Sequence, residues 1–208
     1  MIQIDQLEKK YQQKLVLSIP HLEIGDGIHW LKGANGSGKS TLLKIVGGLI
    51  PYNGTVTLNG IDLKKKPVEF KRMISYAEAE PLYPEFLSGK DLVHFYNVTR
   101  NADGGKSDEL IQLFGIKDYY DQPIGTYSSG MCKRLSLVLT FIGDTKFILL
   151  DEPFVTLDVE TVRKLIAAMI DFHSKDKSFV FTSHQSPEVD ALPISNQWLV
   201  ENQTVRAL

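Results

Sequence analysis

Residues 33–41 read GANGSGKST, and no other stretch of the chain constrains its architecture as strongly. The stretch fits the phosphate-binding P-loop, with glycines, lysine and hydroxyl in the required spacing. The glycines permit positive φ and let bare backbone N–H groups close around phosphate oxygens. The sequence therefore predicts binding of a nucleoside triphosphate. The expected contacts come from Gly33, Ala34, Asn35, Gly36, Ser37, Gly38, Lys39, Ser40 and Thr41.

Three side chains of this loop have distinct expected roles. The ammonium of Lys39 contacts the β and γ phosphates, the hydroxyl of Ser40 ligates Mg²⁺, and Thr41 adds a phosphate contact. The flanking sequence fits, because residues 27–32 have the apolar pattern of a short strand and residues 42–49 that of a helix. The N-terminus of such a helix favours anions, so we expect Mg²⁺-bound nucleotide here.

Composition narrows the class of protein. The chain has 208 residues, of which 43% are hydrophobic, and we expect residues 1–208 to form one domain. A net charge of −2 argues against a direct nucleic-acid partner, since phosphate-dominated binding usually needs a basic surplus. No apolar run approaches the about 18 residues of a membrane helix, and residues 1–10 lack the apolar segment of a signal peptide. We therefore expect a cytoplasmic protein whose single cysteine, Cys132, packs.

The pattern along the chain predicts an α/β fold. Residues 1–7, 15–24 and 55–58 alternate as strands, which indicates an antiparallel β subdomain around the P-loop. A helical insert is expected over about 85–145. Strands at 146–150 and 178–182 flank an amphipathic helix at 157–174, and this alternation implies a mostly parallel sheet.

Local signals predict the ends of several elements. Ser88 followed by Asp91 reads as a capping box for a helix over 90–98. Ser107 is expected to cap a short helix that ends at Gly115. The chain should close with a hairpin formed by 198–200 and 204–207.

Two acids follow the apolar run FILL at 147–150. A buried strand delivers both carboxylates to the carboxyl edge of the sheet, where ligands bind in α/β proteins. Asp151 suits Mg²⁺, directly or through water, while Glu152 points elsewhere and is expected to polarise the water that attacks the γ phosphate. His184 follows the next buried strand and is either a γ-phosphate sensor at the same edge or a structural histidine.

A second potential anion site begins at Ser128. Ser128, Ser129 and Gly130 precede the helical stretch 131–142 and so lie at a helix N-terminus. Taken alone this is an N-cap. Because the chain already holds phosphates at its P-loop, a second subunit's nucleotide is the attractive ligand for this site.

The ordered set GANGSGKST, YSSGMCKR, FILLDEP and VTLD, with a histidine after the next strand, resembles the nucleotide-binding subunit of ATP-binding cassette (ABC) transporters, which are P-loop NTPases. The resemblance covers essentially the whole chain. It implies a head-to-tail dimer in which Ser128, Ser129 and Gly130 face the ATP held by the partner's P-loop. It also implies that Tyr11 stacks on adenine, unless it is an ordinary surface tyrosine. Asp158 matches the loop that couples the two sites, and it also suits a helix cap.

The chain departs from the family pattern twice. The usual leucine-serine-glycine-glycine-glutamine appears as YSSGM at 127–131, so Ser129 adds a side chain where glycine is usual. We expect a working but slower site. Ala79 falls where the family carries a glutamine that touches Mg²⁺ or the attacking water. Either Glu78 or Glu80 substitutes for it, or this contact is missing.

The leading functional hypothesis is an ATPase subunit that dimerises on ATP and drives a separately encoded transmembrane permease from the inner face of the membrane. Residues 83–91 resemble exporter-type members of the family more than importers, which favours an exporter. Hydrophobic residues before the capped helix suggest a docking groove, or else a packed helix start: Leu82, Tyr83, Phe86 and Leu87. The alternatives are a regulatory module with slow catalysis and a soluble ABC-type ATPase acting on nucleic acid. The chain lacks the coiled coil or basic extension expected of the last class.

Overall fold

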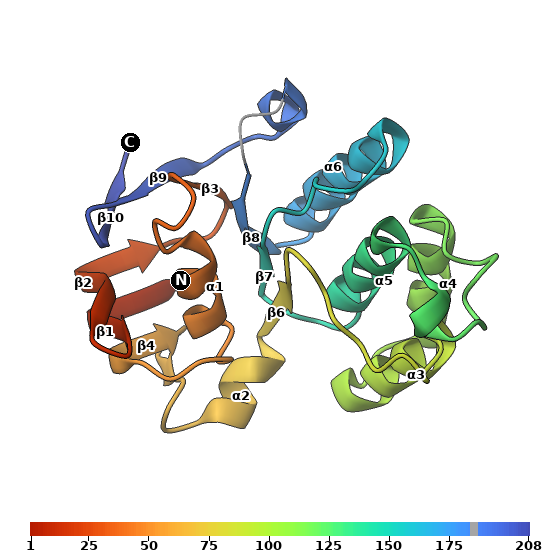
Figure 1. Ribbon diagram of the computed structural model, residues 1–208, viewed down its shortest axis with the longest axis horizontal. Helices are drawn as coiled ribbons and strands as arrows, with labels where there is room; N and C mark the ends of the chain where they lie inside the picture. Colours follow the sequence, from red (N-terminus) through yellow and green to blue (C-terminus); the bar gives the residue numbers. More distant parts are fainter. Residues whose placement is uncertain (184–186) are drawn as a thin grey trace.

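The computed structural model describes residues 1–183 and 187–208, which form two β-sheets with helices packed between and beside them (Figure 1). The smaller sheet has four strands in the order β2-β1-β4-β5, and its neighbouring strands are antiparallel. Its strands are β1 (Ile2–Tyr11), β2 (Lys14–Ile24), β4 (Asn53–Leu58) and β5 (Ile61–Asp62). The predicted N-terminal antiparallel subdomain is therefore confirmed.

The larger sheet has six strands in the order β10-β9-β3-β8-β7-β6. Only the terminal hairpin β9–β10 is antiparallel, and the other neighbours pair in parallel. The sequence predicted this mostly parallel sheet correctly. Its strands are β3 (Ile28–Lys32), β6 (Ile74–Ala77), β7 (Phe147–Leu150), β8 (Ser178–Thr182), β9 (Asn196–Glu201) and β10 (Thr204–Ala207).

The larger sheet has a hydrophobic core on each face. Along β8, Phe179 and Phe181 enter the core under the helical half, whereas Val180 enters the core shared with the smaller sheet. The residues of β7 alternate in the same way. Both faces of these strands are buried, which explains why their sequences are continuous apolar runs and not alternating ones. Helix α1 (Lys39–Val46) fills the space between the two sheets, and α6 (Val159–Ser174) packs on the opposite face (Figure 1).

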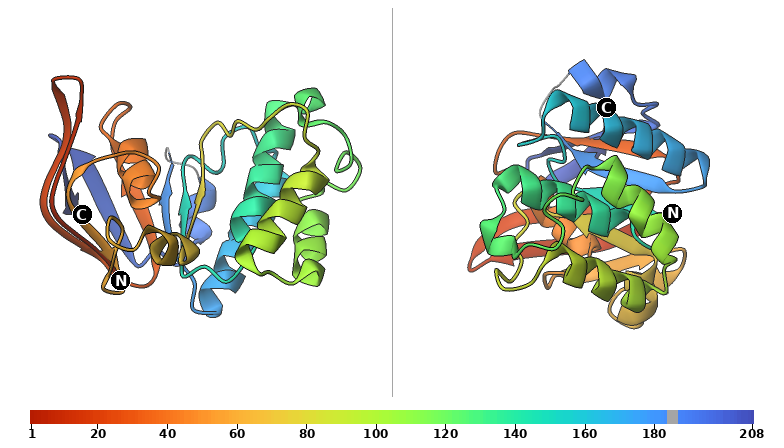
Figure 2. Two further views of the ribbon diagram at one scale, coloured as in Figure 1. Left: turned by 90° about the horizontal axis from the view of Figure 1, so that it is seen from below. Right: turned by 90° about the vertical axis from the view of Figure 1, so that its right-hand side faces the viewer.

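The helical insert lies to one side of the larger sheet, as Figure 2 shows. Its helices are α3 (Gly89–Arg100), α4 (Gly104–Leu113), the short η1 (Ile124–Thr126) and α5 (Ser129–Phe141). The capping box at the start of α3 is confirmed, because Ser88 Oγ accepts from the Asp91 amide and Asp91 accepts from the Ser88 amide. Two further short helices, α2 (Pro67–Arg72) and η2 (Pro187–Ala191), complete the described elements.

The predicted cap at Ser107 is wrong. Helix α4 begins three residues earlier, at Gly104, and Asp103 is its N-cap, accepting from the Gly105 amide at 3.0 Å. Ser107 is buried inside the helix, where its hydroxyl donates to Asn97 Oδ1 at 2.6 Å. Gly115, with φ of 65°, follows the end of α4 as expected. Within residues 1–183 and 187–208, no helix is long and apolar enough to cross a membrane.

Candidate functional site

The loop between β3 and α1 has a backbone that only glycine can adopt at two key positions. Gly33 has φ of 152°, and a Cβ there would lie 2.6 Å from Ser37 Oγ and from the Val200 carbonyl oxygen. Gly38, with φ of 110°, caps α1, and a Cβ would lie 2.9 Å from Leu17 Cδ2. These contacts are closer than real Cβ atoms tolerate, so strand β2 and the C-terminal strands fix the loop from both sides.

The polar groups of this loop suit an anion. Lys39 is buried, and its Nζ donates to the carbonyls of Gly33 at 2.8 Å and Ala34 at 3.0 Å. Asn35 and Ser40 are exposed, and the first turn of α1 carries no acid. Among the described residues, the buried Ser37 Oγ has no hydrogen-bond partner. Open backbone, a nearby ammonium and an unsatisfied hydroxyl together fit a polyphosphate.

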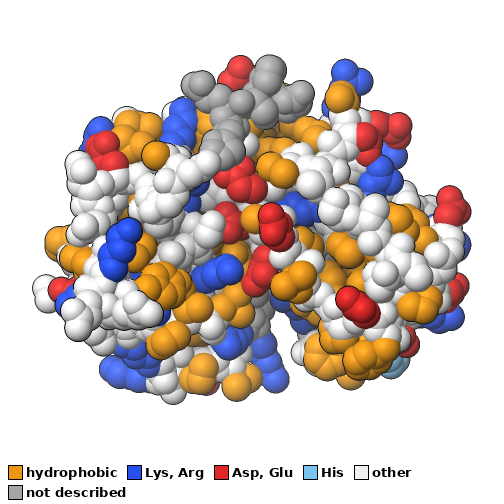
Figure 3. Space-filling model, in the orientation of Figure 1, with side chains coloured by type: hydrophobic (Ala, Val, Ile, Leu, Met, Phe, Trp, Pro, Cys, Tyr) orange, Lys and Arg blue, Asp and Glu red, His pale blue; other side chains and the backbone are white. Residues whose placement is uncertain are grey.

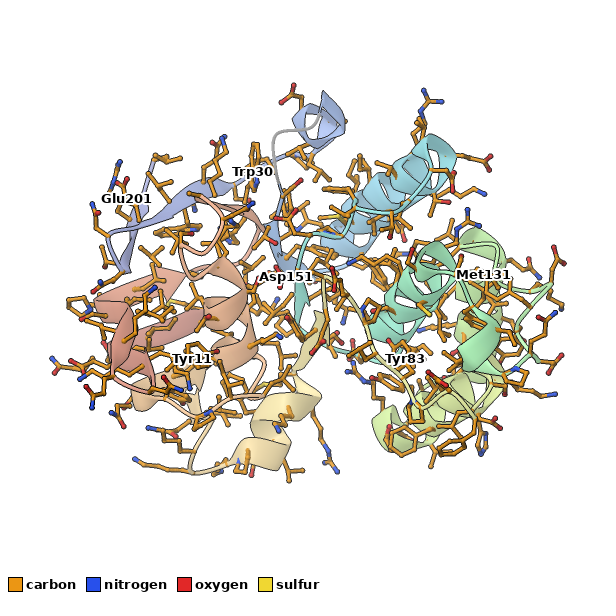
Figure 4. All side chains as sticks on the ribbon, in the orientation of Figure 1. Tyr11, Trp30, Tyr83, Met131, Asp151 and Glu201 are labelled. Carbon is orange, nitrogen blue, oxygen red and sulfur yellow. The ribbon has the colours of Figure 1, made fainter. Side chains whose placement is uncertain are left out.

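Asp151 lies at the carboxyl edge of the larger sheet. The register pairs Leu150 with Phe181 and Leu31 with Thr182, so β3, β8 and β7 end at a common level. Asp151 is buried, and Thr182 Oγ1 donates to its Oδ1 at 2.7 Å. Figure 4 places Asp151 between the β-rich and helical halves. A buried carboxylate beside the P-loop edge fits Mg²⁺, which is usually held by one or two protein ligands plus phosphate oxygens and waters.

Asp151 accepts hydrogen bonds from Tyr76 and Thr182, and neither contact was predicted from the sequence. Tyr76 of β6 donates its hydroxyl to Asp151 Oδ2 at 3.4 Å. Burial, followed by the negative charge of Asp151, raises the pKa of Tyr76, so the phenol stays protonated and able to donate. Thr182 is completely buried at the end of β8. A buried threonine in an apolar strand reads as an ordinary β-branched residue, and only the strand order reveals its contact with Asp151.

Glu152 has an unusual backbone conformation. Its φ is 44°, which is uncommon for a residue other than glycine. Its amide donates to Thr182 Oγ1 at 2.8 Å, so one hydroxyl fixes both acids after β7. Backbone conformations of this kind tend to occur at functional sites, where the surrounding structure holds them in place.

Lys133 is a second buried lysine at this edge, and no sequence pattern indicates its role. It lies in α5, and its Nζ donates to the carbonyls of Glu78, Ala79 and Asp151 at 2.8, 3.0 and 3.1 Å. Burial lowers the pKa of Lys133 to about 8, although the charges of Asp151, Glu152 and Glu80 oppose the shift. The site is therefore built from both the sheet and the helical insert.

Residues 127–131, the signature segment, present two exposed serines. Ser128 is the N-cap of α5, and its Oγ accepts from the Met131 amide at 3.2 Å. Ser128 and Ser129 are exposed. A Cβ added to Gly130 would lie 3.0 Å from the Thr156 carbonyl oxygen. No acid occurs in the first turn of α5. The helix N-terminus thus presents hydroxyls and amides to solvent.

Asp158 caps α6. Its Oδ1 accepts from the Thr161 amide at 2.9 Å, and its Oδ2 accepts from Thr161 Oγ1 at 2.8 Å. The hydrogen bonds from Thr161, aided by the ion pair with Arg134, hold the pKa of this carboxyl well below its usual range. Because Arg134 belongs to α5, the ion pair joins the helix after the signature segment to the helix after the acid pair.

Tyr11 lies at the end of β1, where the hairpin turns into β2. Its side chain is 47% exposed, and Lys9 Nζ lies 4.7 Å from the ring centroid. The left view of Figure 2 shows the tip of this hairpin and the loop before α1 at the same end of the molecule. That placement is compatible with adenine stacking and equally with a surface tyrosine.

His184 lies outside the described residues. The two residues before it are described: β8 ends at Thr182, and Trp30 Nε1 donates to the Ser183 carbonyl at 3.2 Å. The predicted sensor role of His184 therefore stays a prediction.

A groove separates the two halves of the molecule, and Figure 3 shows this face hollowed at its lower edge. Its volume is about 310 Å³, and it lies between the end of α1, α2 and β6 on one side and α3 and α5 on the other. Of the four hydrophobic residues predicted to dock a partner, Leu82 and Phe86 are 89% and 83% exposed. Tyr83 and Leu87 instead pack against the core, as a packed helix start would have them, and docking at this segment stays a prediction.

Comparisons with known proteins agree with this geometry. The profile of the ABC transporter family matches residues 21–155. The ABC transporter ATP-binding protein NatA of Bacillus subtilis is 30% identical over 77% of this chain and 68% of its own length. The cytochrome c biogenesis ATP-binding export protein CcmA of Legionella pneumophila (strain Lens) is 29% identical over 89% of this chain and 93% of its own.

Other relatives are longer. The daunorubicin resistance ATP-binding protein DrrA2 of Streptomyces coeruleorubidus is 30% identical over 80% of this chain, which matches only 56% of that protein. A solved structure of the ATP-binding subunit of an ABC transporter shares the fold, with a TM-score of 0.89 and 20% identity over 100% of this chain and 90% of the other. The P-loop edge, the outward-facing α5 and these matches lead to one conclusion: the chain belongs to the ATP-binding subunit family of ABC transporters.

Proposed function

We propose that this chain hydrolyses ATP in a composite site formed by two ATP-binding subunits, and that hydrolysis drives a separate transmembrane permease. The contrast between two helix N-termini carries the proposal. The end at α1 begins with the buried Lys39, whereas the end at α5 is exposed and carries the hydroxyls of Ser128 and Ser129. A head-to-tail dimer would give α5 its ligand.

The residues at the P-loop edge have separate roles in this scheme. Loop amides and Lys39 hold the phosphates, and Ser40 with Asp151 holds Mg²⁺, which neutralises charge that develops on the transferred phosphoryl group. Glu152 orients the attacking water and accepts its proton. His184 contacts the γ phosphate. Thr182 keeps Asp151 and the Glu152 backbone in place through two short hydrogen bonds.

The groove is the proposed docking site for a cytoplasmic segment of the permease. Tyr76, Tyr83 and Tyr96 line it, and the exposed Leu82 stands at its rim. Lys71 and Arg100 also line it, against a single acid, Glu78. These features favour a helix with apolar side chains and at least one carboxylate. Docked there, the permease would hold this subunit at the inner face of the membrane.

The names of two relatives favour export. CcmA is called an export protein, and DrrA2 is named for daunorubicin resistance. An exporter subunit is therefore the finer form of the proposal.

A slow or regulatory subunit is the second candidate, because of two observations. Ala79 offers no side chain to Mg²⁺ or water, and only its carbonyl is engaged, by Lys133. Ser129 replaces a glycine at the surface expected to meet the partner's phosphates. The rate of ATP hydrolysis distinguishes this candidate from the proposed transport-driving ATPase.

Steady-state hydrolysis with sizing in ATP tests the proposal. The wild type should hydrolyse ATP, and Glu152→Gln should lose about 100-fold or more in kcat while accumulating as an ATP-dependent dimer, since ATP binds but is not cleaved. Glu160→Gln is the matched control, because Glu160 is an exposed acid of α6 that pairs with Lys164. If the wild type shows neither turnover nor dimerisation, the proposed transport-driving ATPase is rejected and the regulatory candidate is favoured.

A further inference from the structure

Lys133 is the buried charge that the reaction scheme leaves without a role. Its side chain is 1% exposed, deeper than any other charged side chain among the described residues. An ammonium buried at this depth is costly unless its protons are well satisfied. All three of its hydrogen bonds end on main-chain carbonyls, and none ends on a carboxylate. The lysine therefore acts on backbone positions.

The three acceptors come from two loops that are distant in sequence. Glu78 and Ala79 follow β6, and Asp151 follows β7, while Lys133 itself lies in the second turn of α5. One ammonium thus joins the helix of the signature segment, the strand end that carries the candidate Mg²⁺ ligand, and the segment that leads to the groove. Glu78 itself lines that groove, as do Pro81 and Tyr83 a few residues later.

Two other hydrogen bonds join β6 to Asp151, from the Asp151 amide to the Ala77 carbonyl at 2.9 Å and from the Tyr76 hydroxyl to Asp151 Oδ2 at 3.4 Å, but neither of them reaches α5. Arg134 pairs with Asp158, but Asp158 is half exposed. Exposed ion pairs fix geometry weakly, whereas several hydrogen bonds from a buried charged donor fix it strongly. Ala79 has only a methyl side chain, so its main chain is the part of this residue that can carry a link.

We propose that Lys133 is a positioning residue that ties the 78–79 backbone and the Asp151 strand end to α5, so that the groove, the metal-binding edge and the signature helix move as one unit. This inference rests on the proposed function for its consequence in catalysis. The tie itself is a property of the free protein.

Amide hydrogen exchange on the protein without nucleotide tests the tie independently of ATP hydrolysis. Lys133→Met removes the ammonium and keeps the length of the side chain. Amides of residues 78–80 should then exchange about tenfold faster or more, because the segment opens locally. Lys146→Met is the control, since Lys146 Nζ donates to the Asp176 carbonyl at 2.8 Å near the other end of β7. It should leave exchange at 78–80 unchanged.

Kinetics test the consequence. Lys133→Met should lower kcat about tenfold or more with little change in KM for ATP, because the P-loop contacts remain and only the placement of Asp151 suffers. If Lys133→Met does not fold, Lys133→Gln, which keeps a neutral donor, should show the same changes to a smaller degree. Unchanged exchange at 78–80 in a folded variant would overturn the tie. Faster exchange with an unchanged kcat would overturn the positioning role, and a wild type without turnover would reject the proposed function alone.

Discussion

The N-termini of α1 and α5, the two ends proposed to bind phosphate, are built to different degrees of completion. At α1 the loop is fixed by close contacts at Gly33 and Gly38, and a buried lysine is already in place. At α5 the end is exposed, carries two serines and has no acid in its first turn. The difference supports the proposal that one chain holds a nearly complete phosphate site and a second half-site that needs another molecule.

The same comparison explains which sequence departures matter. A side chain at Gly38 would strike Leu17, so that position tolerates nothing but glycine. Ser129 replaces the usual glycine at the exposed end of α5 without disturbing the chain's own fold, because it points into solvent. We expect Ser129 to affect the approach of a second subunit and not the stability of this chain.

Removing the cation at α1 should have the largest effect. Lys39→Ala is expected to lower ATP hydrolysis about 100-fold or more, because the ammonium that stabilises developing phosphoryl charge is lost. Steady-state phosphate release measures this, and binding of a fluorescent ATP analogue shows how much of the loss is affinity. Hydrolysis within a few-fold of wild type would mean that the α1 end is not the catalytic one.

Adding a charge at α5 should affect assembly and spare the fold. Ser128→Asp keeps a good N-cap and favours the helix dipole, so thermal stability should be unchanged or slightly higher. The carboxylate should repel the partner's phosphates and reduce hydrolysis about tenfold or more, while ATP binding by the monomer persists. Light scattering in the presence of ATP measures the loss of dimer. Thr126→Asp is the control, because Thr126 is exposed and lies just before the signature segment. Normal dimerisation would contradict a trans role for α5.

Much of this comparison was predictable from sequence. The P-loop glycines, the acid pair and strand β8 follow from short-range patterns, and the structure has β8 at 178–182 as predicted. Ser107 misled because the glycines at 104 and 105 look like loop residues, although Asp103 caps a helix that begins with them. Helix α2 went unpredicted despite the signal of Pro67 at its first position.

The contacts that complete the site could not be predicted in this way. Thr182 holds Asp151 only because β8 lies between β3 and β7, and strand order is not written in any local pattern. Lys133 reads as an ordinary helix lysine, because its three acceptors are backbone carbonyls with no sequence signature. The roles of Tyr11, Asp158 across a dimer and His184 stay predictions.

The smallest expected effect concerns the link between α5 and α6. Asp158→Asn retains a capping oxygen but loses the charge that pairs with Arg134 and faces the N-terminus of α6. Since the folded state lowers the pKa of Asp158, its stabilisation is fully present above pH about 4 and is lost as pH falls further. Thermal unfolding should show a slightly lower Tm for the variant at pH 7 and equal Tm values in strong acid. A gap that persists or widens in acid would contradict this account.

The composite site can be tested most directly by mixing Lys39→Ala with Ser128→Asp. Each variant alone should be nearly inactive, but a mixed head-to-tail dimer contains one site with an intact P-loop from one subunit and an intact signature from the other. At equal concentrations half of the dimers are mixed and each has one good site of two, so hydrolysis should recover to about a quarter of wild type. Activity that stays at the level of the separate variants would contradict a site shared between two chains.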